Sequence, residues 1–545
     1  MKMNSETAII EKRFLETAKA FHGKCSPFHP FAKATDRTAY EMLPTVLKER
    51  LIQAGEAKLG YKFPVIRTTD YMRFKRDGDR AAFETLYFGK RNALNDLIQA
   101  ECVEHQGRFL DDILNGIYSI CEETAWQLPA HNSYIRDTPQ LILPDVTRPV
   151  MDLFACETGA LLACAAYLLE AEFNAVSPFI LTCIEDNLKR RILLPYLTAH
   201  FWWMGHDDEP MCNWTVWCTQ NVLLTTFLMP WSVEMSSRLS APVRTFCGNA
   251  PLFLPKNTSD TIVTLQAILH KAAESCDYFL KDYGTDGCCE EGAQYYRHAG
   301  LCLYGAMTVL NTVTDGHFAP LFQWEKVKNI AAYILNVHVD DKYYFNFADC
   351  SPIAGRAGVR EYLFGKATGQ EDLCLFAAKD FQAGQGQLVT EEVNGGNLFY
   401  RMQTAFHYEG LMQQDTSATL SHRDVYYPSV GLFLVHSDAL DLAVKAGDNA
   451  DSHNHNDTGS ITLYKNGQPI LVDIGVETYT QKTFSPRRYE IWTMQSGYHN
   501  LPTICGTDQK DGAEYRAEKV VTELIGAEPS ISMELAAAYP TAQAT

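Results

Sequence analysis

The sequence predicts a multidomain α+β protein, in which an N-terminal α/α toroid is followed by a C-terminal antiparallel β-sandwich. Residues 1–380 contain about ten helical patterns in series and almost no strand-type alternation, which favours helices packed in pairs. Near residue 385 the pattern changes to short β-type segments separated by Gly and Asn turns. We therefore expect a helical domain at 1–380 and a sandwich at 385–545, short enough to suggest truncation at the C-terminus.

The expected helices carry apolar residues at a spacing of about 3.6, so that one face of each can be buried. Their ranges are 39–57, 80–106, 109–121, 152–173, 185–200, 261–283, 294–314 and 324–336, with one more helix ending at Met229. Residues 365–386 are expected to link the two domains.

The expected strands are short segments rich in β-branched and aromatic residues. Their ranges are 387–393, 397–402, 429–436, 440–446, 460–464, 469–474 and 517–522. Asn466-Gly467 between two of them is a strong hairpin signal. A three-residue loop, Lys465 to Gly467, would pair Tyr464 with Gln468.

Composition indicates an ordinary globular protein of 545 residues with a net charge of −19. That charge disfavours nucleic acid and anionic membranes as partners, and an acidic ligand would need a local basic groove. The N-terminus has no apolar signal region and the chain has no apolar run long enough for a membrane span. With 16 Cys and no CxxC pair, we expect reduced thiols and a cytoplasmic protein, or a periplasmic or secreted one if a signal has been removed. Homo-oligomerisation stays open.

The polar run His453-Asn454-His455-Asn456-Asp457 lies just before the predicted hairpin. Burying polar groups without partners costs up to several kcal/mol, so a cluster this dense rarely serves packing alone. The run therefore marks a candidate site.

This run, together with four later elements, resembles the heparinase II/III-like family of polysaccharide lyases. The later elements are the 459–464 strand, Asn466-Gly467, Asp473 to Val476 with Tyr479, and Tyr498-His499-Asn500. The resemblance implies a cleft between toroid and sandwich, and an enzyme that cuts uronate-containing glycans by β-elimination.

β-Elimination needs a group that neutralises the uronate carboxylate, a base for the C5 proton and an acid for the leaving O4. By resemblance, the Glu-Gly-x-x-Tyr element after Asp286-Gly287 makes Tyr295 the catalytic Tyr, although the adjacent Tyr296 stays open. A free Tyr has a pKa of about 10, so base work needs a nearby cation, for which Arg297 is the candidate. His453 resembles the family's catalytic or substrate-contacting His.

Asn213 matches the family's carboxylate-neutralising Asn, whereas Cys212 departs from the usual polar pair, so the second neutralising group is in doubt. A helix N-cap is the structural alternative for Asn213. The expected substrate contacts are the groove residues Trp126, His131, Trp214, Glu291 and Arg297. The structural alternative for Trp126 is a packed Trp at a helix end.

By resemblance, His455, Asp473 and His499 would be ligands of a structural zinc ion, and two His with one carboxylate suit zinc. On a simple ladder Asp473 lies opposite Gly459, which leaves His455 about 13 Å further along the strand. The metal site therefore requires residues 455–458 to fold back. Hydrogen-bonded loop histidines are the alternative.

Two other function classes stay open beside a lyase for glycosaminoglycans or alginate. One is an inverting glycoside hydrolase, which needs two carboxylates about 6.5–9.5 Å apart. Its candidates are Glu290, Glu291, Asp207, Asp208 and Glu209. The other is a non-catalytic glycan-binding protein on the same scaffold.

Overall fold

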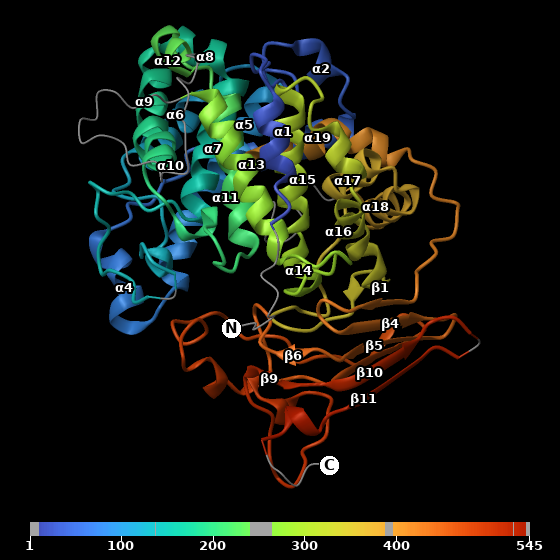
Figure 1. Ribbon diagram of the computed structural model, residues 1–545. Helices are drawn as coiled ribbons and strands as arrows, with labels where there is room; N and C mark the ends of the chain where they lie inside the picture. The colour runs from blue at the N-terminus through green and yellow to red at the C-terminus, as the bar shows by residue number, and fades with distance from the viewer. Residues whose placement is uncertain (1–9, 137, 240–263, 387–395, 527, 541–545) are drawn as a thin grey trace.

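The helical part of the chain lies above a smaller part built of β-sheets (Figure 1). The structure, a computed structural model, describes residues 10–136, 138–239, 264–386, 396–526 and 528–540. The prediction of a helical N-terminal part followed by antiparallel sheets is confirmed.

The helices of the helical part range in length from 5 to 24 residues. In chain order they are α1 (Arg13–Ala20), α2 (Arg37–Glu41), α3 (Thr45–Glu56), α4 (Thr68–Asp77), α5 (Ala81–Glu104), α6 (Leu110–Cys121), α7 (Leu153–Leu168), α8 (Glu170–Val176), α9 (Phe179–Leu188), α10 (Leu194–Thr198), α11 (Asn213–Leu228), α12 (Val233–Leu239), α13 (Leu265–Asp282), α14 (Gly292–Tyr296), α15 (Gly300–Val313), α16 (Glu325–Asn336), α17 (Val359–Thr368), α18 (Glu371–Ala383) and α19 (Leu398–Met412).

Helices α7 and α11 form the centre of the helical part and are buried on nearly every face. Small residues let the two pack closely. A Cβ at Gly159 of α7 would lie 2.8 Å from the hydroxyl oxygen of Thr225 on α11. A helix buried all round needs no polar face, which explains why neither sequence has a clear apolar stripe.

Several predicted helices are interrupted in the structure. Pro44, which lacks an N–H, begins α3 and divides the 39–57 helix. The 185–200 helix contains a π-helical turn, η2 (Lys189–Leu193), between α9 and α10. The 294–314 helix is divided into α14 and α15.

The predicted linker and one predicted strand are wrong. Residues 365–386 contain the end of α17 and all of α18. Residues 397–402 begin α19, because the Asn397 side chain caps the helix by accepting from the N–H groups of Phe399 and Tyr400. Its aromatic residues face the helical core rather than a sheet. The predicted strand at 387–393 lies outside the described residues.

The largest sheet has five antiparallel strands in the order β3-β4-β5-β7-β8, and the predicted strands that fall in it are confirmed. Two further pairs, β6-β9 and β10-β11, complete the described strands of this part. The strands are β3 (Val425–Tyr427), β4 (Leu432–His436), β5 (Leu440–Lys445), β6 (Asp448–Asn449), β7 (Ile461–Lys465), β8 (Gln468–Leu471), β9 (Gly512–Arg516), β10 (Glu518–Glu523) and β11 (Ser530–Glu534), while a small pair, β1 (His338–Asp340) with β2 (Tyr343–Tyr344), follows α16.

The β7-β8 hairpin forms at Asn466-Gly467, but its predicted register is wrong. Lys465 pairs with Gln468, so the loop has two residues rather than three. Asn466 and Gly467 both have positive φ, 51° and 72°, as a type I′ turn requires. A bulge between Leu463 and Tyr464 then shifts the ladder.

The helical and sheet parts are joined by hydrogen bonds at several points. Asp286 accepts from the N–H and hydroxyl of Ser429, at 2.9 and 2.8 Å. Asn346 and Asp473 exchange two bonds at 3.1 and 3.2 Å. The change from helices to strands falls between Met412 and Val425, later in the chain than residue 385. The domain bounds 1–380 and 385–545 stay a prediction.

The cysteines that the structure describes are all free thiols, most of them buried. No single described helix is long and apolar enough to cross a membrane. The bent pair α7-α8 passes a test of length and composition only, and α7 is the central buried helix of the core.

Glu157 on α7 supplies a testable pH dependence of stability. Burial raises the pKa of Glu157 to about 7, although Trp217 donates to its carboxylate at 2.8 Å. The folded chain therefore holds this proton more tightly than the unfolded chain, whose Glu pKa is about 4.5. The contribution to stability is full below pH 4.5 and is lost as the pH rises through about 7.

We expect Glu157→Gln to flatten this dependence by roughly 3 kcal/mol at most. Gln removes the ionisation but can still accept the bond from Trp217. Denaturant unfolding of both proteins at pH 5 and pH 8 measures the effect. Parallel losses of unfolding free energy in the two proteins would contradict it.

Candidate active site

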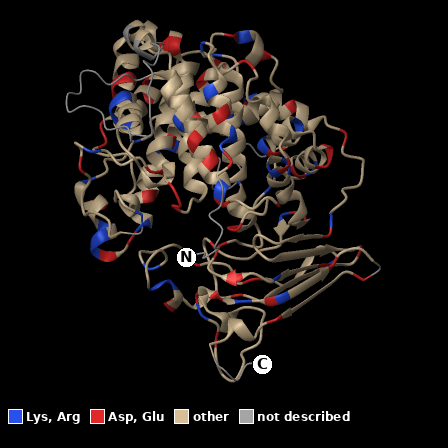
Figure 2. Cartoon of the chain, viewed as in Figure 1, with Lys and Arg blue, Asp and Glu red and all other residues tan. Residues whose placement is uncertain are grey.

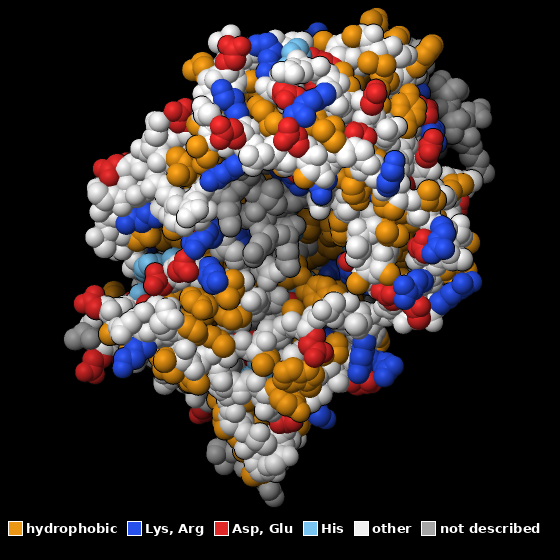
Figure 3. Space-filling model, turned by 180° about the vertical axis from the view of Figure 1, so that it is seen from behind, with side chains coloured by type: hydrophobic (Ala, Val, Ile, Leu, Met, Phe, Trp, Pro, Cys, Tyr) orange, Lys and Arg blue, Asp and Glu red, His pale blue; other side chains and the backbone are white. Residues whose placement is uncertain are grey.

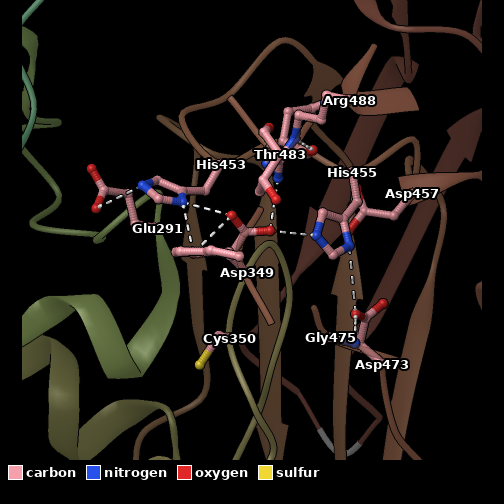
Figure 4. Close-up of polar contacts among 12 residues, drawn as sticks. Glu291, Asp349, Cys350, His453, His455, Asp457, Asp473, Gly475, Thr483 and Arg488 are labelled. Atoms are coloured by element: carbon pink, nitrogen blue, oxygen red, sulfur yellow. Dashed lines mark hydrogen bonds and ion pairs between the residues drawn. The ribbon is translucent and has the colours of Figure 1, made fainter. Parts of the chain in front are cut away.

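The candidate site lies where the helical part meets the sheets, and on the face shown in Figure 3 the molecule is hollowed at this junction. A row of acidic and imidazole side chains runs from Glu291 through His453, Asp349 and His455 to Asp473 (Figure 4). Glu291 and Asp349 come from the helical part of the sequence, and the other three from the sheet part. The site is therefore assembled across the junction.

His453 lies in the loop after β6 and has a left-handed backbone, with φ of 58°. Its Nδ1 donates to Asp349 Oδ2 at 2.7 Å, which leaves Nε2 directed at Glu291, 3.8 Å away. Burial alone would lower the pKa of His453. The bond to Asp349 and the charge of Glu291 outweigh burial, so its pKa is raised.

Asp349 is the centre of the row. Its Oδ1 accepts from His455 Nε2 at 2.9 Å and from Arg488 at 2.7 Å, while its Oδ2 accepts from His453 and from the Tyr479 hydroxyl at 3.0 Å. Burial would raise the pKa of this carboxyl, but these donors outweigh burial and hold the pKa well below its usual range. Asp349 is thus a fully buried carboxylate with four donors.

Tyr295 lies on α14 beside His453, with ring centroids 4.5 Å apart. Its hydroxyl is hydrogen-bonded to the hydroxyl of Tyr479, which in turn donates to Asp349. Burial raises the pKa of Tyr295. Tyr295 is therefore a neutral phenol at neutral pH, suited to donate a proton rather than to accept one.

Asn213 is the first residue of α11, and its side-chain amide donates to Glu291 Oε2 at 2.7 Å. Burial raises the pKa of Glu291 despite the nearby His453. Cys212 precedes the helix and offers no capping bond, so the first N–H groups of α11 are not capped by this side chain. Asn213 and Glu291 are thus held together as a hydrogen-bonded pair at the start of α11.

Arg297 is not the cation beside Tyr295, so the prediction that it lowers the pKa of that tyrosine is wrong. Its guanidinium donates to the carbonyl of Ala354 and lies 3.4 Å from Glu361, inside the helical core. Two residues along a helix turn the side chain by about 200°, so Arg297 faces away from Tyr295. Tyr296 is fully buried and donates to the carbonyl of Ala331 at 3.2 Å, which favours Tyr295 as the site Tyr.

Trp126 does not line this site, so the prediction that it contacts the substrate is wrong. The side chain is 2% exposed, donates to the carbonyl of Ile120 and carries Arg191 over its ring. Because Trp126 follows a helix end, the helix packs it inward, as the structural alternative had it.

His131 and Trp214 do form an aromatic row near Asn213. Their rings lie 4.7 Å apart, and His131 Nδ1 is 2.7 Å from Asp152. The row continues to Trp202, 5.1 Å from Trp214, and Arg136 lies 4.7 Å above Trp202. Carbohydrate sites use such partly exposed rings beside polar groups.

His455, Asp473 and His499 form a buried cluster in which one ligand atom from each lies within 4.8 Å of the others. Residues 455–458 do fold back as the metal site requires, with the N–H of Ser460 bonded to the carbonyl of Asp457. His455 Nδ1 and His499 Nε2 are buried and have no hydrogen-bond partner. These two orphaned nitrogens, with Asp473 beside them, fit a divalent metal ion.

Lys and Arg are interspersed with Asp and Glu over both parts of the molecule (Figure 2). Two arginines, Arg80 and Arg136, lie near enough to the site for their charges to act on its residues. The charges of Arg80 and Arg136 lower the pKa values of Tyr295 and Glu291, respectively, by amounts smaller than the effect of burial.

Comparison with known proteins identifies the sheet part. Residues 419–534 match the family model described as heparinase II/III-like, C-terminal. This segment is a heparinase II/III-like domain. A search of curated proteins finds no match.

The fold around the heparinase II/III-like domain is also similar to solved structures. Heparinase III matches with a TM-score of 0.51 and 12% identity over 98% of this chain and 74% of that chain. Heparan sulfate lyase HepC from Pedobacter heparinus has a TM-score of 0.45 at 12% identity, over 94% and 67% of the two chains. The heparinase III-BT4657 gene product has 0.47 at 12%, over 95% and 69%. The first of these shows that the whole chain shares the heparinase III fold.

Sequence reasoning missed two central residues of the site, Asp349 and Arg488. Asp349 follows an aromatic run that no local pattern distinguishes, and Arg488 lies in a short 3-10 turn (Arg488–Glu490). Tyr479 belonged to the family-like elements, but nothing in the sequence gave it a role. These three residues are recognised only in the structure, by their hydrogen bonds to His453 or to Asp349.

Proposed function

We propose that this protein is a polysaccharide lyase that cuts uronate-containing glycans by β-elimination. The observation that carries the proposal is the convergence of Tyr295, His453 and the Asn213–Glu291 pair at the junction of the two parts. These groups are an acid, a base and a carboxylate-binding pair, the three that the reaction needs.

The Asn213–Glu291 pair would receive the uronate carboxylate. The second N–H of the Asn213 amide can donate to it, and the raised pKa of Glu291 lets this residue share a proton with an incoming carboxylate. Neutralising the uronate makes its C5 proton easier to remove, because the enolate-like charge is stabilised.

His453 would take the C5 proton and Tyr295 would give a proton to O4. Because Asp349 accepts the Nδ1–H bond, the neutral imidazole has its lone pair on Nε2, on the side of Glu291. Tyr295 keeps its proton because burial raises its pKa. The neutral form of the His453 imidazole would thus act as base, and the Tyr295 phenol as acid, on the uronate.

A glycosaminoglycan, or an oligosaccharide derived from one, is the substrate class that we favour, with alginate next. The heparinase III fold supports this choice. Arg80 and Arg136 would supply the local positive charge that the net charge of −19 makes necessary.

The test is a panel of heparan sulfate, chondroitin, hyaluronan and alginate oligosaccharides followed by near-UV absorbance. Elimination makes a 4,5-unsaturated uronate that absorbs there, so a rise in absorbance supports a lyase and the responding glycan names the specificity. New reducing ends without absorbance would mean hydrolysis. Binding without either product would mean a glycan-binding protein.

We further propose that the metal is zinc and that it is structural, held by His455, Asp473 and His499. It would fix the loop that presents His453, two residues before His455. We expect about one zinc per chain, and a lower melting temperature after chelation.

His499→Ala should lose the zinc, whereas the exposed His206→Ala should keep it. Elemental analysis and thermal unfolding with and without chelator measure both effects. Purified protein with little zinc, and with a melting temperature that chelation does not change, would contradict the metal site.

A further inference from the structure

A second cavity lies in the helical part and is not used by the proposed reaction. Its volume is about 580 Å³, and it is lined by residues 122–127 after α6, the 144–150 loop, and the chain from η2 to residue 201. None of Tyr295, His453, Asn213 and Glu291 lines it. The first turn of α7 separates the two sites, since Ala155 lines this outer cavity while Phe154 stacks on His131 of the candidate site.

Three guanidinium groups line the outer cavity, those of Arg148, Arg190 and Arg191. Arg190 is paired with Asp186 at 2.8 Å. Among the described residues, no carboxylate oxygen lies within 4.0 Å of the guanidinium of Arg148 or Arg191. Within the described part of the chain, these two guanidinium groups therefore form no ion pair.

Arg191 is held rigidly by neutral acceptors. It donates to the carbonyls of Glu123 and Cys121 at 2.7 and 3.3 Å and to the Asn187 side chain at 3.1 Å. Neutral acceptors fix the guanidinium without cancelling its charge. The π-helical turn η2 carries this residue, and such turns are often found at functional sites.

The lining also contains three carboxyl groups, those of Glu122, Glu123 and Asp145, of which Glu123 forms ion pairs outside the cavity. Glu123 is buried and paired with Lys90 and Arg91, both at 2.8 Å. Asp145 accepts from the N–H and hydroxyl of Thr147 at 2.9 and 2.7 Å. Arg148 and Arg191 still have guanidinium N–H groups that no described carboxylate accepts, and these groups can bind an anion.

The rest of the lining suits a sugar better than a bare anion. Val146, Pro149 and Leu194, none of which is buried, contribute apolar surface, and Thr124 and Thr198 contribute hydroxyls. The volume is within the range of about 300–1,000 Å³ for small-molecule sites and exceeds what an inorganic ion fills. A pyranose ring has apolar C–H faces and a rim of hydroxyls, which matches this mixture.

We propose that the outer cavity is a second, non-catalytic binding site for an acidic sugar unit, with Arg148 and Arg191 binding its carboxylate or sulfate. The choice of a sugar rests on the proposed function. A polymer held at this site as well as in the cleft would be bound more tightly than a short oligosaccharide, because the second contact is intramolecular.

The probe is a glucuronyl-N-acetylglucosamine disaccharide, measured by calorimetry on the full chain. Arg148→Glu should weaken disaccharide binding at the outer cavity at least tenfold and leave binding at the candidate active site unchanged. The exposed control Lys519→Glu on β10 should change neither. Arg148 is exposed, so its reversal should leave the fold intact. Arg148→Glu should also lower kcat/KM for polymer several-fold and change that for short oligosaccharides less than twofold.

Disaccharide binding that is unchanged in Arg148→Glu and in Arg191→Met, but lost in Asn213→Ala, would overturn the inference. Inorganic sulfate that binds the outer cavity as tightly as the disaccharide would overturn the sugar assignment. A protein that eliminates none of the four glycans, yet binds the disaccharide through Arg148, would support this site and overturn the proposed function.

Discussion

Tyr295→Phe should lower kcat by about 10²–10⁴-fold with little change in KM, because it removes only the proton that the phenol gives to the leaving oxygen. The ring remains beside His453, and the substrate contacts of Asn213 and Glu291 are untouched. Initial rates from near-UV absorbance, on the glycan that responds best, measure the effect.

Tyr296→Phe is the matched control for this substitution. Its hydroxyl is buried and donates to the carbonyl of Ala331, which is not a group of the site. We expect it to keep its activity and to lose about 1 kcal/mol of stability. Full activity in Tyr295→Phe together with inactivity in Tyr296→Phe would show that Tyr296, and not Tyr295, is the catalytic tyrosine.

Asp349→Asn should be the second large effect, through the residues that Asp349 positions. The amide cannot accept from His453 Nδ1, His455, Arg488 and Tyr479 as the carboxylate does, so His453 loses both its orientation and its tautomer. We expect kcat to fall by about 10²–10³-fold. Stability should fall by about 3–5 kcal/mol, because Arg488 is left buried without its anion.

Asp441→Asn is the control for Asp349→Asn, since Asp441 also pairs with a His, His436, at 3.1 Å on the five-stranded sheet. It should cost less stability and no activity. Steady-state kinetics well below the melting temperature separate kcat from KM, and denaturant unfolding gives the stability. A rise in KM alone, with kcat preserved, would mean that Asp349 does not position the base.

Much of the fold follows from local patterns, and the exceptions have identifiable causes. The strands at β4, β5, β7 and β8 follow from β-type residues bounded by Gly and Asn. The helix α19 was mistaken for a strand because Phe399 and Tyr400 have high β propensity, which packing against the helical core overrides. Asn397, an N-cap residue in front of that segment, was the signal for a helix.

The candidate site was predictable where polar residues were dense in sequence and not where they were isolated. His453, His455 and Asp457 are neighbours along the chain, so their density marked the site. Asp349 is a single carboxylate 104 positions away from His453, and only the tertiary fold brings the two together. Trp126 and Arg297 failed for a different reason, since the direction of a side chain at a helix end depends on packing.

The segment around Asn346 and Asp349 belongs to the helical half in sequence but is bonded to the sheet half in space. The two halves are therefore not interchangeable modules cut between Met412 and Val425. A chimera joined between Met412 and Val425 would combine Asp349 of this protein with the histidines of a relative. Such a junction separates Asp349 from His453 and His455, which it must contact. A crossover placed before residue 343 keeps Asp349 together with His453, His455 and Asp473 and leaves only Glu291 of the row on the other side, so hybrids of this protein are better joined there.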